Sequence, residues 1–284
     1  MPPRLISGLS ELAPGHDALV CDVWGVIHDG RSAHPAAADA LSRFRGRHGP
    51  VVLLTNAPRT PEEVAAQCAS YGVPGDCYDA IVSSGGAARD AVAAMAAGRE
   101  LPLYYIGPDR DLPVIAGLPV RRAPIAEAEA ALCIGLADDM TETPDDYKDV
   151  LAAMRARDLV MLCANPDLVV HRGARLVYCA GALAAAYEAL GGHAVYYGKP
   201  HRPVYEAALA AAARIAGRPP RKPLAVGDGL LTDVRGANGM GLDVLFVADG
   251  IHGEEVEPYT PEHLAALFAR HGVDALAATR ALAW

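Results

Sequence analysis

The sequence predicts an α/β protein built on a doubly wound, mostly parallel sheet with helices on both faces. Short apolar runs such as ALVCDVW and VVLLTNA alternate with helical patterns such as PEEVAAQCASYG, and the alternation resumes after about residue 195 in PLAVGDG and LDVLFVADG. Strands that alternate with helices form βαβ units, which bring neighbouring strands together in parallel. The composition, 52% hydrophobic and 21% charged, is typical of a globular chain.

Three helix starts have a clear signature. Each places a threonine, whose hydroxyl can accept a backbone hydrogen bond, before a proline at the first helical position. The three are Thr60-Pro61 followed by Glu63, Thr143-Pro144 followed by Asp146, and Thr260-Pro261 followed by His263.

The middle of the chain has strands and helices of its own, in ALCIGLA, DYKDVLAAMRARD and VMLCANPD. We therefore expect residues 86–190 to form an inserted domain. Residues 1–85 and 191–284 then form the core domain.

Charge and composition exclude several classes of partner and site. A net charge of -9 without a basic block argues against nucleic-acid binding, which depends on Lys and Arg neutralising phosphates. The N-terminal segment lacks the features of a signal peptide, and the Ala-rich runs are too short to span a bilayer, so we expect a soluble, cytoplasmic protein. The six cysteines form no CxxC motif and are predicted to be small buried hydrophobic residues rather than disulfides or zinc ligands.

Polar residues follow four of the apolar runs. Asp22 follows ALVC, Thr55 and Asn56 end VVLLTN, Lys199 follows AVYYG, and Asp228 follows PLAVG. The carboxyl ends of parallel strands lie along one edge of a doubly wound sheet, and ligands bind in the crevice there. Each residue alone is typical of a turn or cap, but together they predict a single site.

The motifs DVWGVIHDG, LLTNAPR, CANPD, YYGKP and GDGLLTDVRGANGMG occur in this order along the chain. In this set and order the sequence resembles the haloacid dehalogenase (HAD) superfamily phosphatases of the class IIA, NagD-like branch. The resemblance covers nearly the whole chain. It implies a Rossmann-like core with an inserted α/β cap domain that closes over it, and a homodimer formed through the cap.

The resemblance also implies a metal-assisted phosphate site. Asp22 corresponds to the nucleophile, which forms an aspartyl-phosphate that water later hydrolyses. Asp22, Asp228 and the main-chain carbonyl of Trp24 would bind Mg²⁺, with Asp233 as a ligand through water. These are hard oxygen ligands of the kind that Mg²⁺ prefers.

Thr55, Asn56 and Lys199 would contact the phosphate. Thr55 and Asn56 donate to its oxygens, and Lys199 supplies a point charge to the phosphoryl group and to Asp22.

In the cap, CANPDLVVHRGARLVYCAG resembles the stretch that returns to the core. Asn165 and Asp167 are candidates for orienting this connection, and His171 or Arg172 for reaching an anionic substrate. The alternative is that they are solvated loop residues. The acidic segment ADDMTETPDDY, where the cap usually faces substrate, weakly disfavours highly anionic substrates.

One position departs from the family pattern. The residue two after the nucleophile is usually a second Asp, which protonates the leaving oxygen and then activates water, whereas this chain has Trp24. An indole has a single N–H donor and cannot exchange a proton near neutral pH. General acid–base catalysis contributes about 10² to 10⁴-fold, so we expect a slow enzyme or one restricted to good leaving groups. His28 and Asp29 are candidate replacements, and Asp29 is equally a turn residue.

The sequence thus predicts a Mg²⁺-dependent phosphatase that acts on a small phosphorylated metabolite. The alternative is a catalytically impaired protein that binds a phosphorylated ligand in a regulatory role. Phosphotransfer to an acceptor other than water is a third hypothesis, but it too needs a proton-transfer group.

Overall fold

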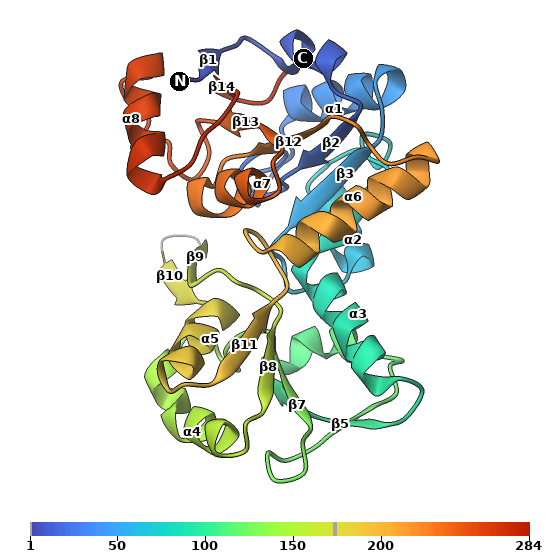
Figure 1. The fold of residues 1–284 in the computed structure, drawn as a ribbon, viewed down its shortest axis with the longest axis vertical. Coiled ribbons are helices and arrows are strands. Elements are labelled where there is room, and N and C mark those ends of the chain that lie inside the picture. Colours follow the sequence, from blue (N-terminus) through green and yellow to red (C-terminus); the bar gives the residue numbers. More distant parts are fainter. Residues whose placement is uncertain (1, 173–174) are drawn as a thin grey trace. The chain divides into compact units, whose positions relative to one another are not determined.

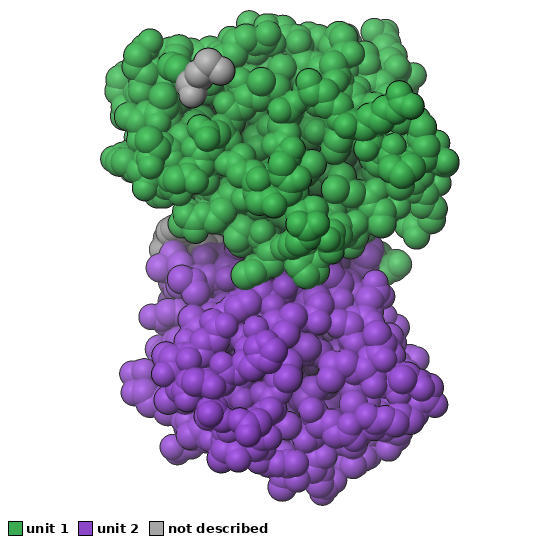
Figure 2. Space-filling model, in the orientation of Figure 1, with its two compact units in different colours: residues 1–55, 62–82, 199–284 green, residues 56–61, 83–198 purple. Residues whose placement is uncertain are grey.

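The computed structural model describes residues 2–172 and 175–284, excluding the side chains of residues 171 and 172. The chain divides into two compact units, coloured separately in Figure 2. Unit 1 comprises residues 1–55, 62–82 and 199–284, and unit 2 comprises residues 56–61 and 83–198. Parallel sheets flanked by helices confirm the predicted α/β class (Figure 1).

Unit 1 is built on a seven-stranded sheet with the order β1-β14-β13-β12-β2-β3-β4. The apolar run of β2 lies in the middle of the sheet, where it pairs in parallel with both β12 and β3. A strand in this position is covered on both faces, which explains why it is uniformly apolar rather than alternating. The strands are β1 (Arg4–Leu5), β2 (Ala18–Cys21), β3 (Val51–Thr55), β4 (Ala80–Ser83), β12 (Pro223–Gly227), β13 (Asp243–Val247) and β14 (Ala277–Thr279).

Helices pack against this sheet with their apolar faces. Val20 and Val52 of the sheet share a buried cluster with Tyr205 of α6 and Phe268 of α8. Fully burying a side chain such as Val contributes about 1.5–3 kcal/mol, so the cluster fixes the positions of the strand ends. The helices are α1 (Pro35–Arg47), α2 (Pro61–Ser70), α6 (Arg202–Ala216), α7 (Arg235–Gly239) and α8 (Pro261–His271).

Unit 2 has a five-stranded parallel sheet of order β11-β8-β7-β5-β6, and a separate antiparallel pair, β9 and β10. Helices α4 and α5 contribute to the buried cluster on one face of the larger sheet, and α3 to the cluster on the other. The strands are β5 (Leu101–Ile106), β6 (Val120–Arg122), β7 (Ala130–Cys133), β8 (Val160–Cys163), β9 (Val169–Arg172), β10 (Arg175–Tyr178) and β11 (His193–Tyr196). The helices are α3 (Ser84–Ala96), α4 (Lys148–Ala156) and α5 (Ala180–Ala189).

The units differ from the expected domain boundaries. Strand β11, which the sequence pattern placed in the core after residue 190, pairs instead with β8 of unit 2, and this unit runs to Gly198. Residues 56–61, expected in the core, also belong to unit 2. The residue types of an apolar strand do not indicate which sheet it joins, because sheet membership depends on the strands with which it forms hydrogen bonds.

The predicted helix starts differ in outcome. Pro61 and Pro261 begin α2 and α8, and the Thr260 hydroxyl accepts a hydrogen bond from the backbone N–H of His263. Thr143 and Asp146 form a capping box, but it opens a short 3-10 turn ahead of α4 rather than the α-helix itself.

The six cysteines are all free and buried, as expected for small hydrophobic residues. Among the helices described, none combines the length and the apolar character needed to span a bilayer.

Candidate functional site

Asp22 occupies the carboxyl end of β2 in unit 1. Its backbone N–H donates to the carbonyl of Val226 on β12 at 2.8 Å, which continues the sheet pairing to the end of the strand. Its carboxylate Oδ1 accepts from the N–H of Val23 at 2.7 Å. Only 8% of Asp22 is exposed, so the strand end holds a buried carboxylate in a fixed orientation.

Asp228 follows β12, the neighbour of β2. Its Oδ2 accepts a hydrogen bond of 2.8 Å from the N–H of Ile251, in the loop after β13. A Cβ on Gly25 would lie 2.2 Å from this oxygen, and one on Gly250 would lie 2.1 Å from it. Gly25 also has a φ of +82°, in the left-handed region that favours glycine. Two loops can therefore approach Asp228 because these positions lack side chains.

Asp233 lies in a short π-helical turn, Leu230–Val234, directly after the Asp228 loop. Its Oδ2 accepts from the N–H of Gly229 at 3.1 Å and from the Thr232 hydroxyl at 3.2 Å. The buried Tyr205 on α6 donates its hydroxyl to the backbone carbonyl of Asp233 at 3.0 Å. Single π turns recur at functional sites, and here the turn points a carboxylate towards Asp228 and Asp22.

Lys199 contacts two of these acids. Its Nζ lies 2.5 Å from Oδ1 of Asp22 and 2.8 Å from Oδ1 of Asp233, and 3% of the residue is exposed. Burial by itself would lower the pKa of Lys199, but Asp22 and Asp233 outweigh it and raise the pKa well above its ordinary value. The lysine is therefore charged.

The three carboxylates form one cluster. Ligand oxygens of Asp22, Asp228 and Asp233 all lie within 4.8 Å of one another. Burial, with repulsion from neighbouring carboxylates, raises the pKa of each to about 6 against the opposing pull of Lys199. Three buried anions with one buried cation leave a local charge of about -2, which is costly away from water.

A divalent cation fits this cluster. It would balance the excess charge, and carboxylate oxygens are the ligands that Mg²⁺ and Ca²⁺ prefer. Asp22, Asp228 and Asp233 are the residues of unit 1 that would hold it.

Trp24 is 47% exposed, in the loop that follows Asp22. The indole Nε1 would lie 2.9 Å from a Cβ on Gly30, so the ring edge rests against that glycine, whose φ is +83°. The backbone of the loop is held by a hydrogen bond of 2.8 Å from the N–H of Gly25 to the carbonyl of His28. The indole therefore belongs to a hydrogen-bonded loop that directly follows Asp22, the candidate nucleophile.

His28 and Asp29 have structural contacts in this loop. Nδ1 of the buried His28 accepts from the N–H of Gly30 at 3.1 Å, and its ring meets Tyr71 edge-on at 4.9 Å. Burial lowers the pKa of His28, which favours the neutral ring. Asp29 is exposed, and its Oδ1 accepts from the backbone N–H groups of Arg31 and Ser32, both at 2.8 Å. These contacts favour the turn interpretation of Asp29 over a catalytic one.

The remaining predicted residues fall in two places. Thr55 is buried at the end of β3 in unit 1, whereas Asn56 belongs to unit 2. Nδ2 of Asn56 donates to Oδ1 of Asp167 at 2.9 Å, and the side chain of Asn165 accepts from the N–H of Asp167 at 3.1 Å. Asn56, Asn165 and Asp167 therefore form one polar network, which the sequence analysis did not foresee.

His171 and Arg172 are backbone members of β9, but their side chains lie outside the described part of the structure.

Several contacts of the site escaped the sequence analysis. The backbone donors at Val23 and Ile251 cannot be identified from residue type, because every residue except proline has the same N–H. Tyr205 looks like an ordinary core residue of a helix. The glycine in VWG was a usable signal, since a glycine next to a functional strand end often marks a close approach.

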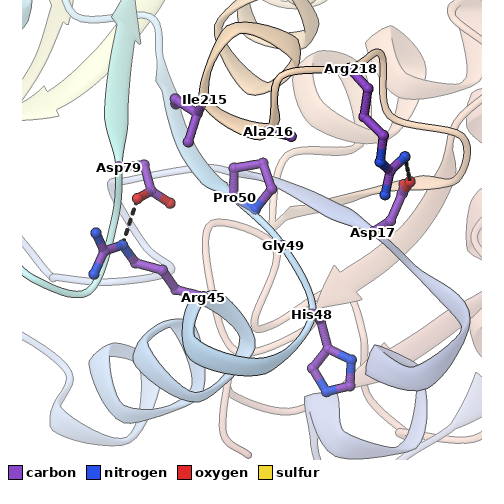
Figure 3. A pocket seen from close by; sticks show the side chains of 9 residues that line it. All are labelled: Asp17, Arg45, His48, Gly49, Pro50, Asp79, Ile215, Ala216 and Arg218. Carbon is purple, nitrogen blue, oxygen red and sulfur yellow. Dashed lines mark hydrogen bonds and ion pairs between the residues drawn. The ribbon is translucent and has the colours of Figure 1, made fainter.

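A separate cavity of about 490 Å³ lies in unit 1 (Figure 3). It is lined by residues just before β2 and β3, such as Asp17 and Pro50, and therefore lies at the opposite edge of the sheet from Asp22. Arg218 pairs with Asp17 at 2.8 Å, and Arg45 with Asp79 at 2.6 Å. Its charged groups satisfy one another, so this cavity is a poor candidate for phosphate chemistry.

Comparison with known proteins identifies two matching family models. Residues 19–118 match a model described as haloacid dehalogenase-like hydrolase, and residues 196–270 match one described as HAD-hydrolase-like. The matched segments contain Asp22, Lys199, Asp228 and Asp233.

Three relatives illustrate the likeness. A hydrolase of the haloacid dehalogenase-like family from Brucella suis is 41% identical, with a TM-score of 0.84 over 98% of this chain and 100% of its own. The D-glycerol 3-phosphate phosphatase of Mycobacterium tuberculosis is 30% identical over 249 residues, which cover 86% of this chain and 66% of that protein's length. NagD from Escherichia coli shares the fold, with a TM-score of 0.67 and 21% identity over 93% of this chain and 96% of its own.

Glycerol phosphate phosphatase from Mycobacterium tuberculosis has also been solved in complex with magnesium. That structure is 27% identical, with a TM-score of 0.65 over 89% of this chain and 74% of its own.

Proposed function

We propose, from the premise that the chain belongs to the haloacid dehalogenase-like hydrolases and to their class IIA, NagD-like branch, that it is a Mg²⁺-dependent phosphatase of small phosphorylated metabolites. The matches confirm the family predicted from the sequence, and the phosphatase relatives confirm the prediction of a phosphoric monoester hydrolase. The proposed metal site and mechanism rest on one observation, which is the buried cluster of three carboxylates in contact with a single lysine.

Asp22 is the nucleophile of this proposal. The contacts from Val23 and Lys199 both reach Oδ1, so we assign the attack to Oδ2. A bond forms between this oxygen and phosphorus while the ester P–O bond breaks, and the alcohol oxygen leaves with the electron pair and takes a proton from solvent. Water then attacks the phosphorus of the aspartyl-phosphate, which releases inorganic phosphate and restores Asp22.

Lys199, Asp228 and Asp233 support this step through charge. Lys199 holds Asp22 in place and offers its ammonium group to phosphoryl oxygens. Mg²⁺, held by Asp22, Asp228, Asp233 and the carbonyl of Trp24, would supply the positive charge that makes a phosphate monoester a competent electrophile. Thr55 and Asn56 remain the proposed hydrogen-bond donors to the phosphate.

Because Trp24 stands where a general acid is expected, the proposed enzyme is limited to substrates with good leaving groups. The indole cannot exchange a proton near neutral pH, burial lowers the pKa of His28, and the carboxylate of Asp29 accepts hydrogen bonds from the backbone of its own turn. Glycerol 3-phosphate, the substrate named for the Mycobacterium tuberculosis relative, is an alkyl phosphate and belongs in the test panel beside an aryl phosphate. The comparisons lend no support to the alternative of a binding protein without activity.

The decisive experiment measures phosphate release from p-nitrophenyl phosphate with Mg²⁺. We expect wild-type turnover that is lost at least about 10³-fold in Asp22→Asn, because an amide cannot form the phosphoenzyme. Asp39→Asn, at an exposed acid of α1 paired with Arg43, is the matched control and should retain full activity. Equal rates for Asp22→Asn and wild type would contradict the nucleophile, and Mg²⁺ binding without any turnover would favour the binding-protein alternative.

Two further properties are proposed with the function. Free, buried cysteines fit a reducing compartment, so we propose a cytoplasmic location. We also propose that the chain forms a homodimer through unit 2, and sedimentation at micromolar concentration tests this, since a monomer would contradict it.

A further inference from the structure

The loop that follows β13 contacts the Asp228 loop of unit 1 through three consecutive residues. Gly250 passes so close that a Cβ there would overlap the Asp228 side chain. The N–H of Ile251 donates to Oδ2 of Asp228 at 2.8 Å. The next residue, His252, accepts at Nε2 from the N–H of Leu230 at 3.3 Å. The first two contacts reach the Asp228 side chain, and the third reaches the backbone two residues after it.

The backbone N–H of Leu230 needs an acceptor from outside its own turn. Leu230 opens the short π-helical turn Leu230–Val234, and the first N–H groups of a helical segment have no partner within it. Leu230 has no exposed surface, so solvent cannot replace the missing acceptor. The ring of His252 supplies it. His252 therefore anchors the start of the turn that carries Asp233.

Glu255 determines which nitrogen of the His252 ring accepts. A backbone N–H is always a donor, so Nε2, which faces Leu230, is the nitrogen without a proton. The other nitrogen, Nδ1, lies 2.9 Å from Oε1 of Glu255. This hydrogen bond lowers the pKa of Glu255, which keeps it an ionised acceptor, so Nδ1 carries the proton and donates. Both hydrogen bonds require the same tautomer, and Glu255 thus orients the ring for its contact with Leu230.

The loop that carries His252 is fixed at both ends. Before it, the N–H of Ala248 donates to the carbonyl of Thr279 on β14 at 2.8 Å, which continues the sheet pairing beyond β13. After it, Val256 is fully buried in the core cluster of unit 1, and its N–H donates to the carbonyl of His252 at 3.2 Å. His252 therefore has a firm base from which to hold the neighbouring turn.

We propose that His252 is a positioning residue of the metal site, which keeps the segment from Asp228 to Asp233 in the arrangement that lets both carboxylates serve one cation. The inference rests on the proposed function, because it assumes that the carboxylate cluster binds Mg²⁺. It goes further by assigning a role to a side chain that is not itself a ligand. Replacing a hydrogen-bond partner that orients metal ligands typically costs about 10–100-fold in metal affinity. Since His252 acts through the backbone, we expect a loss at the lower end of this range.

The first test is a calorimetric titration of the full-length protein with Mg²⁺. We expect His252→Leu, which has a side chain of similar size without an acceptor, to weaken Mg²⁺ binding by about tenfold. His252→Gln should restore most of the affinity, because its side-chain oxygen can accept from the N–H of Leu230. His48→Leu is the matched control and should bind as wild type does. His48 is another partly buried histidine of unit 1, and it lines the cavity at the opposite edge of the sheet from Asp22 (Figure 3).

Hydrogen–deuterium exchange of the metal-free protein gives a second readout, which depends neither on the metal nor on turnover. The N–H of Leu230 should exchange at least about tenfold faster in His252→Leu than in wild type, and His252→Gln should restore its protection. The N–H of Asp22, which is bonded to the carbonyl of Val226, is the internal reference. Its exchange should not change, because the proposed effect of His252 is local.

The outcomes separate this inference from the function on which it rests. If wild type itself binds no Mg²⁺, the proposed metal site fails and the role of His252 fails with it. If wild type binds Mg²⁺ and His252→Leu binds it equally well, only the role of His252 is overturned. Exchange of Leu230 that is the same in both proteins would overturn it too. Faster exchange of Leu230 and Asp22 together, without rescue by His252→Gln, would indicate a merely structural residue and would also overturn the proposal.

Discussion

Replacing Trp24 with aspartate should change how the rate depends on the leaving group. Without a general acid, the departing oxygen carries its charge unprotonated, so wild type should hydrolyse aryl phosphates and barely touch alkyl phosphates. Trp24→Asp puts a carboxyl group two residues after the nucleophile and should accelerate alkyl substrates by up to about 10² to 10⁴-fold. This gain corresponds to roughly 3–5 kcal/mol of transition-state stabilisation.

The structure bounds the cost of this substitution. Trp24 is 47% exposed, so the substitution removes the contacts of the half of its surface that is buried, while the loop keeps its backbone hydrogen bond between Gly25 and His28. The indole edge does rest on Gly30, however, and its removal lets this part of the loop shift. A shift of about 1 Å can cost as much as 10²-fold in rate, so the informative quantity is the slope of log kcat/KM against leaving-group pKa, not a single rate.

The assay uses a series of aryl and alkyl phosphates with Mg²⁺, and Trp24→Asn is the matched control. Asparagine has nearly the size of aspartate but cannot give up a proton, so it should keep the steep wild-type slope. If Trp24→Asp and Trp24→Asn have the same slope, the reasoning is refuted. If wild type is already insensitive to the leaving group, another residue acts as the acid, and His28→Ala and Asp29→Asn identify it.

The remaining predictions concern metal binding, backbone conformation and pH. Asp228→Asn should weaken Mg²⁺ binding by at least about tenfold in a calorimetric titration, because a neutral amide cannot offset the cation's charge; unchanged affinity would remove Asp228 from the metal site. Gly25→Ala should destabilise the protein by at least about 1–2 kcal/mol in thermal unfolding, because the φ of Gly25 is +82° and the new methyl group would lie 2.2 Å from Oδ2 of Asp228. Gly46→Ala is the control: a Cβ there would have no atom within 4 Å, so this substitution should be neutral or stabilising. Burial opposes ionisation of Asp17, but backbone donors and Arg218 outweigh it and hold the pKa at about 2, below the ordinary 3.8. Since the pKa of Asp17 is lower in the folded state, its carboxylate stabilises the fold by up to about 2 kcal/mol above pH 4, and this contribution is lost as the pH falls towards 2. The difference in the free energy of urea unfolding between wild type and Asp17→Asn should therefore become smaller over that range. A difference that does not change with pH would contradict this prediction.

Local sequence was sufficient for the residues that follow the central strands. Asp22 and Asp228 come directly after apolar runs that become the adjacent strands β2 and β12, and adjacent parallel strands end at the same edge. Because ligands bind at the carboxyl ends of parallel strands, the sequence pattern alone predicted that the two acids share one site. Asp233 follows a few residues later in the same loop.

Local sequence was insufficient to predict contacts between residues that lie far apart in the chain. Lys199 was placed at the end of a core strand, but the strand before it, β11, pairs with β8 of unit 2, and the lysine nevertheless contacts an acid 177 positions away. Asn56 is predicted, and remains proposed, as a phosphate donor, but its contact with Asp167, 111 positions along the chain, was not foreseen. Hydrogen-bond partners at such separations depend on chain packing, which a pattern of residue types does not encode.

The sequence alone determined the α/β class and the acids at the strand ends, because periodicity and strand-end polarity are local properties. The family followed from the resemblance of its ordered motifs. The tertiary structure decided which sheet β11 joins, how one lysine meets two carboxylates, and which backbone N–H groups orient Asp22 and Asp228. It also gave His28 and Asp29 their places in a loop and exposed the indole of Trp24. These are consequences of distance and burial, which arise only when segments far apart in the chain pack together.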